Sequence, residues 1–190
     1  MPQTHSSSAW VSGLLELFAS RGVHVPRLLA AAAIDPARLD RPGERFSADE
    51  ISHLWELAVA WSGDTTLGLD REATAKFANF DVLGYAIASC PDLRTGLDEL
   101  SRYMAVLSNA ATFHLSRDGD NTWLVLGRLG VSRPVPRQRF AFGLLALLTL
   151  CQWVTRRPIE PLAAEFSFAR PADADRYRGV FGCPLRFDQP

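Results

Sequence analysis

The chain has 190 residues, of which 47% are hydrophobic, 22% charged and 10% aromatic. This length fits one compact domain, or one domain with a small helical addition, and such a chain buries roughly 70% of its unfolded surface without a metal or disulfide staple. The composition excludes intrinsic disorder. The net charge of −1 argues against a strongly basic nucleic-acid-binding domain.

The cysteines and the N-terminus indicate where the protein is found. Cys90, Cys151 and Cys183 are widely spaced without a CxxC pair, which argues against a zinc knuckle or a redox dithiol. The polar N-terminus lacks the pattern of a secretory signal. The longest apolar run, Phe140 to Cys151, is too short to span a bilayer of roughly 30 Å. We therefore expect a reduced, cytoplasmic protein without contact to a membrane.

Helices dominate the predicted first half. Apolar residues at helical spacing predict a helix over Trp10–Ser20, and Pro26 opens a second one over Pro26–Ala33. A turn-rich linker follows over 35–45. Ser47 and Glu50 then have the spacing of a capping box ahead of a longer helix, whose aromatic stripe we expect in the core.

The middle of the chain changes from helical to alternating periodicity. A weaker helix is predicted over 65–75, a turn over 79–81, a helix over 82–90 and another from Leu93, which Asp92 or Thr95 would cap. Alternating segments then predict strands over residues 111–117 and 122–129, joined by the turn sequence Asp118-Gly119-Asp120-Asn121.

The helix predicted over Arg137–Thr155 is apolar on nearly every face and must be covered on all sides. After it, strands are expected over 163–168 and 185–187, with a short helix over 172–180 between them. The sum is an α+β fold, in which a helical N-terminal half precedes a small antiparallel sheet packed around a central apolar helix. We treat residues 1–190 as a single domain, with a helical segment over 1–45 and an α+β core over 46–190.

No compact catalytic motif is present: the sequence has no GxSxG, P-loop, GxGxxG or HExxH pattern. The four histidines form no ligand array with cysteines or carboxylates. We therefore predict no catalytic residue, no metal and no cofactor. Arginines concentrate only at Arg133, Arg137 and Arg139 and at Arg156-Arg157. Arginine at a helix start opposes the helix dipole, so Arg137 and Arg139 have less structural reason to be there, and an anion such as a ligand carboxylate would explain one of them.

Three segments of the chain resemble a known family. Val82 to Leu93 (VLGYAIASCPDL) resembles a segment of the N-terminal, arabinose-binding-type domain of AraC-family transcriptional regulators, and the following Gly96 to Tyr103 is similar to that family's next helix. The tail, FSFARP with YRGVFGCPLRF up to Phe187, is similar to its C-terminal motif. The turn at 79–81 departs from the family, in which many members have a glycine-rich turn.

The resemblance implies a regulatory, non-enzymatic role. Relatives continue into a domain with two helix-turn-helix units, which we expect to be missing from this chain, so that DNA would be bound only through that other part. The chain would bind a small-molecule effector, form a homodimer, or do both, and so bias the attached DNA-binding domain. Two alternatives remain open: a stand-alone small-molecule enzyme, and a dimerisation module that binds no ligand.

Effector pockets are mostly apolar with a few oriented polar groups. Polar or amphipathic side chains within apolar segments are therefore the candidates for ligand binding. These are Tyr85, Tyr103, His114, Trp123, Arg139 and Gln152. The helix over Arg137–Thr155 is the candidate for coupling a pocket to a dimer interface, although the same pattern also fits an ordinary core helix.

Overall fold

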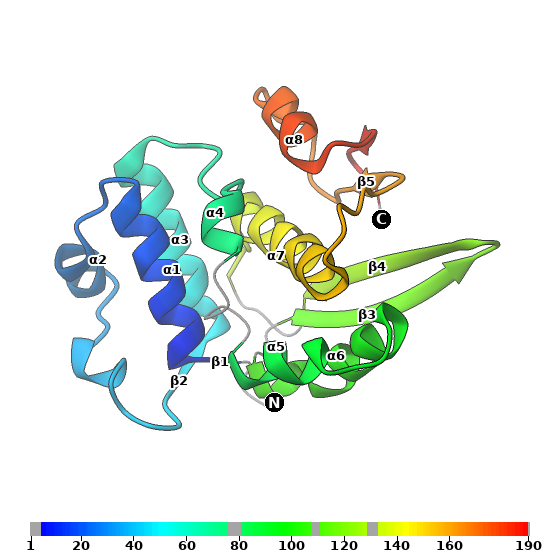
Figure 1. Cartoon of the computed structure of the whole chain (residues 1–190). Coiled ribbons are helices and arrows are strands. Elements are labelled where there is room, and N and C mark those ends of the chain that lie inside the picture. The colour runs from blue at the N-terminus through cyan, green and yellow to red at the C-terminus, as the bar shows by residue number, and fades with distance from the viewer. Residues whose placement is uncertain (1–4, 76–80, 108–110, 129–132, 190) are drawn as a thin grey trace.

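The computed structural model describes residues 5–75, 81–107, 111–128 and 133–189. Its helices and strands are, in chain order, β1 (His5–Ser7), α1 (Ser8–Ser20), α2 (Val25–Ala31), a 3-10 turn (Pro36–Arg38), β2 (Arg45–Ser47), α3 (Ala48–Ser62), α4 (Arg71–Thr74), α5 (Asp81–Ala88), α6 (Leu93–Leu107), β3 (Ala111–Asp118), β4 (Asn121–Arg128), α7 (Arg137–Thr155), β5 (Ala164–Glu165), α8 (Ala174–Phe181) and β6 (Leu185–Arg186). This is the predicted α+β fold. Figure 1 shows α7 in the middle of the molecule, between the N-terminal helices, the β3–β4 hairpin and α8.

The N-terminal helices share one core with the segment that follows them. Ser47 and Glu50 form the predicted capping box: the Glu50 amide donates to the Ser47 hydroxyl at 3.1 Å, and the Ser47 amide donates to the Glu50 carboxylate at 2.6 Å. The rings of Phe18 and Trp55 meet edge to face with centroids 5.0 Å apart. Their hydrophobic cluster takes residues from both sides of residue 45.

Two short strands that the sequence pattern does not predict precede α1 and α3. β1 and β2 pair antiparallel, with Ser6 opposite Phe46. Each has three residues, which is too short for an alternating pattern to be recognised. The pairing brings the starts of α1 and α3 together.

The helix predicted over 65–75 is reduced to the four residues of α4. The Thr66 amide donates to the Asp64 carboxylate at 2.8 Å, which stabilises a turn instead. Gly68 lies against α7, so closely that a Cβ there would stand 2.0 Å from the carbonyl oxygen of Gln138. A local side-chain bond and a tertiary contact thus replace the first part of the expected helix.

The β3–β4 hairpin follows the predicted pair of helices. The Thr95 amide donates to the Asp92 carboxylate at 2.8 Å, which confirms Asp92 as the cap of α6. β3 and β4 pair antiparallel up to Asp118 opposite Asn121, as the turn sequence predicts. In the predicted turn at 79–81, residues 79 and 80 lie outside the described residues, as does residue 129 of the predicted second strand.

The apolar faces of α7 are covered by three hydrophobic clusters that surround the helix. Phe142 packs among the N-terminal helices. Four other residues of α7, Ala146, Leu147, Leu150 and Cys151, pack against α5, α6 and the hairpin. Its remaining buried face packs against α8 and the aromatic rings of the C-terminal segment. The central helix of the predicted fold is therefore the element that joins all parts of the core.

The C-terminal segment forms a small unit of its own against α7. The regions predicted as strands over 163–168 and 185–187 contribute only β5 and β6, which pair parallel to each other in a sheet separate from the hairpin. Five aromatic rings of this unit pack together: Phe166, Phe168, Tyr177, Phe181 and Phe187. Ring packing, more than the two-residue strands, therefore stabilises this part of the fold.

Candidate functional site

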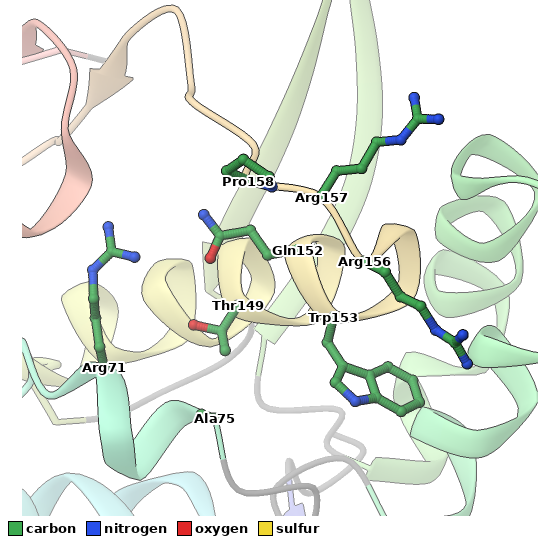
Figure 2. Close-up of a pocket in the computed structure, with 8 residues that line it drawn as sticks. All are labelled: Arg71, Ala75, Thr149, Gln152, Trp153, Arg156, Arg157 and Pro158. Atoms are coloured by element: carbon green, nitrogen blue, oxygen red, sulfur yellow. The ribbon is translucent and has the colours of Figure 1, made fainter.

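An open pocket of about 530 Å³ lies at the C-terminal end of α7, between α4 and the segment that leaves α7 (Figure 2). Its lining residues are Arg71, Ala75, Thr149, Gln152, Trp153, Arg156, Arg157 and Pro158. This volume is within the range of small-molecule sites. The lining comes from α4, α7 and the start of the connection to β5, so the pocket lies where three parts of the fold meet.

Most polar groups on the α4 side of the pocket are already engaged. The Arg71 guanidinium donates to the backbone oxygen of Val180 in α8. The Thr149 hydroxyl donates to Leu145 of the preceding turn at 2.8 Å and lies 3.1 Å from the hydroxyl of Thr74. These bonds connect α4 to α7 and to α8 along the edge of the pocket.

The other side of the pocket is built by the end of α7. Arg156 caps the helix in a left-handed conformation, with φ of 53°, which a residue with a side chain rarely adopts. The Trp153 side chain is 42% exposed. Figure 2 shows the Arg156 side chain running alongside the Trp153 indole, whereas Arg157 points to the opposite side of the chain. The Trp153 ring and the Arg156 guanidinium thus lie side by side at the edge of the pocket.

Gln152 is the one predicted ligand-binding residue that lines this pocket. Its side-chain amide donates to the backbone oxygen of Ile159 at 3.0 Å, which fixes the segment after α7. Trp153 and Arg156 were missed as candidates because an aromatic residue on a helix and an arginine at its end have ordinary structural explanations. The signal that could have found them is the run Gln152-Trp153, Arg156-Arg157-Pro158, which combines an aromatic ring with adjacent cations where a helix stops.

The structure places the other aromatic and histidine candidates elsewhere. Tyr85 on α5 is 66% exposed and Tyr103 on α6 is 46% exposed. His114 of β3 is exposed and pairs with Val125, while Trp123 of β4 is half-buried and pairs with Ser116. His114 and Trp123 therefore share one face of the hairpin, opposite to the face of Phe113, which joins the core. These four residues do not line the pocket.

Arg139 is largely buried between α7 and α3. Its Nη1 donates to the backbone oxygen of Ala48 and to the hydroxyl of Ser52, both at 2.9 Å. Burial lowers the pKa of the guanidinium to about 10, and the nearby charge of Asp49 partly opposes this shift. Arg139 thus has protein partners in its place near the start of α7, and its contact with a ligand carboxylate stays a prediction.

Arg137 also has a structural role. Its Nη1 and Nη2 bind both oxygens of Asp173, at 2.7 Å and 3.0 Å.

Among the described residues, no three His, Cys, Asp or Glu side chains gather where they could hold a metal ion. None of the described helices combines the length and the apolar character that crossing a bilayer requires.

Comparison with known proteins identifies the family of the chain. Residues 22–190 match the family model described as the arabinose-binding domain of AraC transcription regulators, N-terminal. The match covers most of the chain, so the chain belongs to this family of regulatory N-terminal domains. The resemblance inferred from the segments around Gly84 and Phe181 is thereby confirmed.

Three curated proteins are similar to the chain. The ornithine utilization regulator of Pseudomonas aeruginosa is 31% identical over 185 residues, which cover 96% of this chain and 54% of that protein. Two uncharacterized HTH-type transcriptional regulators, from Mycobacterium bovis and Mycobacterium tuberculosis, are each 32% identical over 109 residues, or 57% of this chain and 32% of theirs. The chain thus spans about half the length of the Pseudomonas relative and less of the mycobacterial ones.

Proposed function

We propose that this chain is the effector-binding domain of a transcriptional regulator of the AraC type, and that the pocket at the end of α7 receives the effector. One observation carries this proposal: in a member of this regulatory family, a pocket of small-molecule size lies at the junction of α4, the end of α7 and the connection that leads to the C-terminal unit. A ligand there would touch the segments that link the core to the end of the chain.

The pocket supports a mechanism of regulation. An effector shifts an equilibrium only if it binds one conformation more tightly than another. The Arg71 bond to Val180 and the Thr74–Thr149 contact border the pocket and connect α4 with α8 and α7. An effector that changes these contacts would change how the C-terminal unit packs on α7, and this difference would reach a DNA-binding domain that follows.

Several further roles belong to the same proposal. We propose that residues 1–190 act as one domain, that DNA is bound by another part of the full protein, and that the regulator forms a homodimer. The near-neutral charge of this chain supports DNA binding elsewhere. The domain would bind its effector without converting it, and the protein would work in the cytoplasm, where a bacterial-type regulator meets DNA.

A thermal-shift screen tests effector binding directly. A metabolite present at about 100 times its Kd should raise the Tm of the chain by roughly 5–10 °C, because it binds the native state alone. The library should hold anionic, neutral and cationic compounds, with ornithine included because of the name of the Pseudomonas relative. A compound that raises the Tm should also change the output of a transcriptional reporter driven by the full-length regulator.

Two controls separate this proposal from its alternatives. Mass spectrometry of the bound compound should show no turnover after long incubation, whereas a product would favour an enzyme. Sedimentation analysis with and without the compound gives the oligomeric state. A stable dimer that no library compound affects, in the screen or in the reporter, would contradict effector sensing and leave a dimerisation module.

A further inference from the structure

The charged side chains that line the pocket at the end of α7 are all positive. Three of its eight lining residues, Arg71, Arg156 and Arg157, are cationic, and no lining residue is acidic. Arg71 is bonded to Val180, but within the described part of the chain the guanidiniums of Arg156 and Arg157 form no hydrogen bond or ion pair. Two cationic side chains thus lie at the pocket without an anionic partner among the residues that the structure describes.

The helix dipole explains only part of this arrangement. Cations near the C-terminus of α7 are favourable because the last carbonyl groups carry partial negative charge. That attraction does not require Arg156 to adopt a left-handed backbone, which costs energy for a residue with a Cβ and is usually left to glycine, as at Gly63 and Gly182 after α3 and α8. Arg156 thus occupies a left-handed position at the end of a helix, where glycine is the usual residue.

We propose that this pocket binds an organic anion, namely a small carboxylate with an apolar body. The inference rests on the proposed function, since it names the chemical class of the effector. Arg156 binds the carboxylate, because the planar guanidinium matches its two oxygens. The half-exposed indole of Trp153, beside Arg156 in Figure 2, packs against the apolar body. Arg71 and Arg157 add to the positive field.

The same charges select against cationic ligands. A dibasic amino acid such as ornithine carries one carboxylate and two ammonium groups, so it would bring a net positive charge to a pocket lined by Arg71, Arg156 and Arg157. Like charges in one pocket repel each other, and salt screens this repulsion where the groups are exposed. The pocket therefore favours monocarboxylates over their neutral amides and over dibasic compounds.

Calorimetric titration of the chain tests this order. The probes are benzoate, phenylacetate and octanoate, each compared with its neutral amide, together with ornithine. We expect at least one carboxylate to bind about tenfold or more tightly than its amide and than ornithine, with an affinity that falls as NaCl is raised. Arg156→Gln should weaken binding of that carboxylate about tenfold. Arg102→Gln, on the exposed face of α6, should leave it unchanged.

The outcomes separate this inference from the proposed function. Equal binding of a carboxylate and its amide, full affinity in a folded Arg156→Gln protein, or no binding of any carboxylate probe at millimolar concentration would overturn the anion site. If a neutral or cationic metabolite still raises the Tm and switches the reporter, effector sensing stands and only the ligand class is wrong. Failure of every compound class in both assays would also remove the proposed function.

Discussion

Arg137 at the start of α7 and Asp173 just before α8 form a bidentate ion pair, although they are 36 residues apart in the sequence. The Thr65 hydroxyl donates to the same carboxylate at 2.6 Å, and Arg137 also lies 3.4 Å from the hydroxyl of Tyr177. One carboxylate therefore connects the loop after α3, the central helix and α8. Both charged side chains are mostly shielded from solvent.

Asp173→Asn should destabilise the fold. The substitution removes the charge that balances the partly buried Arg137, which should lower the free energy of unfolding by about 1–3 kcal/mol in urea denaturation. Asp175→Asn is the matched control, since its pair with Arg178 lies on the surface of the same helix and should change stability by about 0.5 kcal/mol or less. Equal effects of the two substitutions would contradict the role of Asp173.

The stabilising effect of Asp173 should depend on pH. The hydrogen bond from Arg137 lowers the pKa of Asp173 below its ordinary value near 3.8, with a smaller contribution from Thr65 and against the effect of burial. The native state thus favours the ionised carboxylate, so its contribution is complete above about pH 4 and is lost as the pH falls through the lowered pKa. The stability difference between the wild type and Asp173→Asn should shrink between pH 4 and pH 2. A constant difference over that range would be evidence against this linkage.

Gly68→Ala should disrupt the contact between the loop before α4 and α7. The added Cβ would stand 2.0 Å from the Gln138 carbonyl oxygen. This oxygen belongs to the backbone of a helix, so it cannot move aside as the end of a flexible side chain could. We expect a loss of about 2–4 kcal/mol in the free energy of unfolding. Gly179→Ala in α8, where a Cβ meets nothing within 4 Å, should be neutral or stabilise the helix by about 0.5–1 kcal/mol. Similar behaviour of both variants would rule out the close approach.

Local features of the fold can be read from the sequence because the interacting groups are near neighbours. The capping box of Ser47 and Glu50 and the cap at Asp92 each span three residues, so residue type and spacing are sufficient. The contact of Gly68 with Gln138 is different. It depends on how α7 packs across the chain, and no local pattern at Gly68 distinguishes it from a glycine in a turn.

The lining of the pocket cannot be read from local sequence patterns, because it depends on contacts between distant segments. The pocket forms where α4 meets the end of α7, so its lining depends on tertiary packing. Gln152 was found because it interrupts an apolar helix. His114 interrupts an apolar segment in the same way, but it lies on the outer face of the hairpin. A polar residue within an apolar segment marks a position that is worth considering as a site. The pattern does not show which residues of other segments lie next to it.

Arg139→Ala should reveal the structural role of a side chain that the sequence assigned to ligand binding. The buried guanidinium bonds Ala48 and Ser52 of α3, so its loss should cost about 1–3 kcal/mol of unfolding free energy in urea. Arg94→Ala, an exposed arginine in the first turn of α6, should change stability by about 0.5 kcal/mol or less. Unchanged stability with lost effector binding would instead favour the original assignment of Arg139 to a ligand carboxylate.

The three cysteines should differ in reactivity toward a thiol reagent such as DTNB at pH 8. Burial among residues of α5, α6 and the hairpin raises the pKa of Cys151 to about 11, and burial also raises the pKa of Cys183. The thiolate is the reactive form, so both should react slowly in the native protein. Cys90 is partly exposed and should react first. In urea all three should react at similar rates, and rapid labelling of Cys151 in the native state would mean that the packing of α7 against α5 and α6 opens readily.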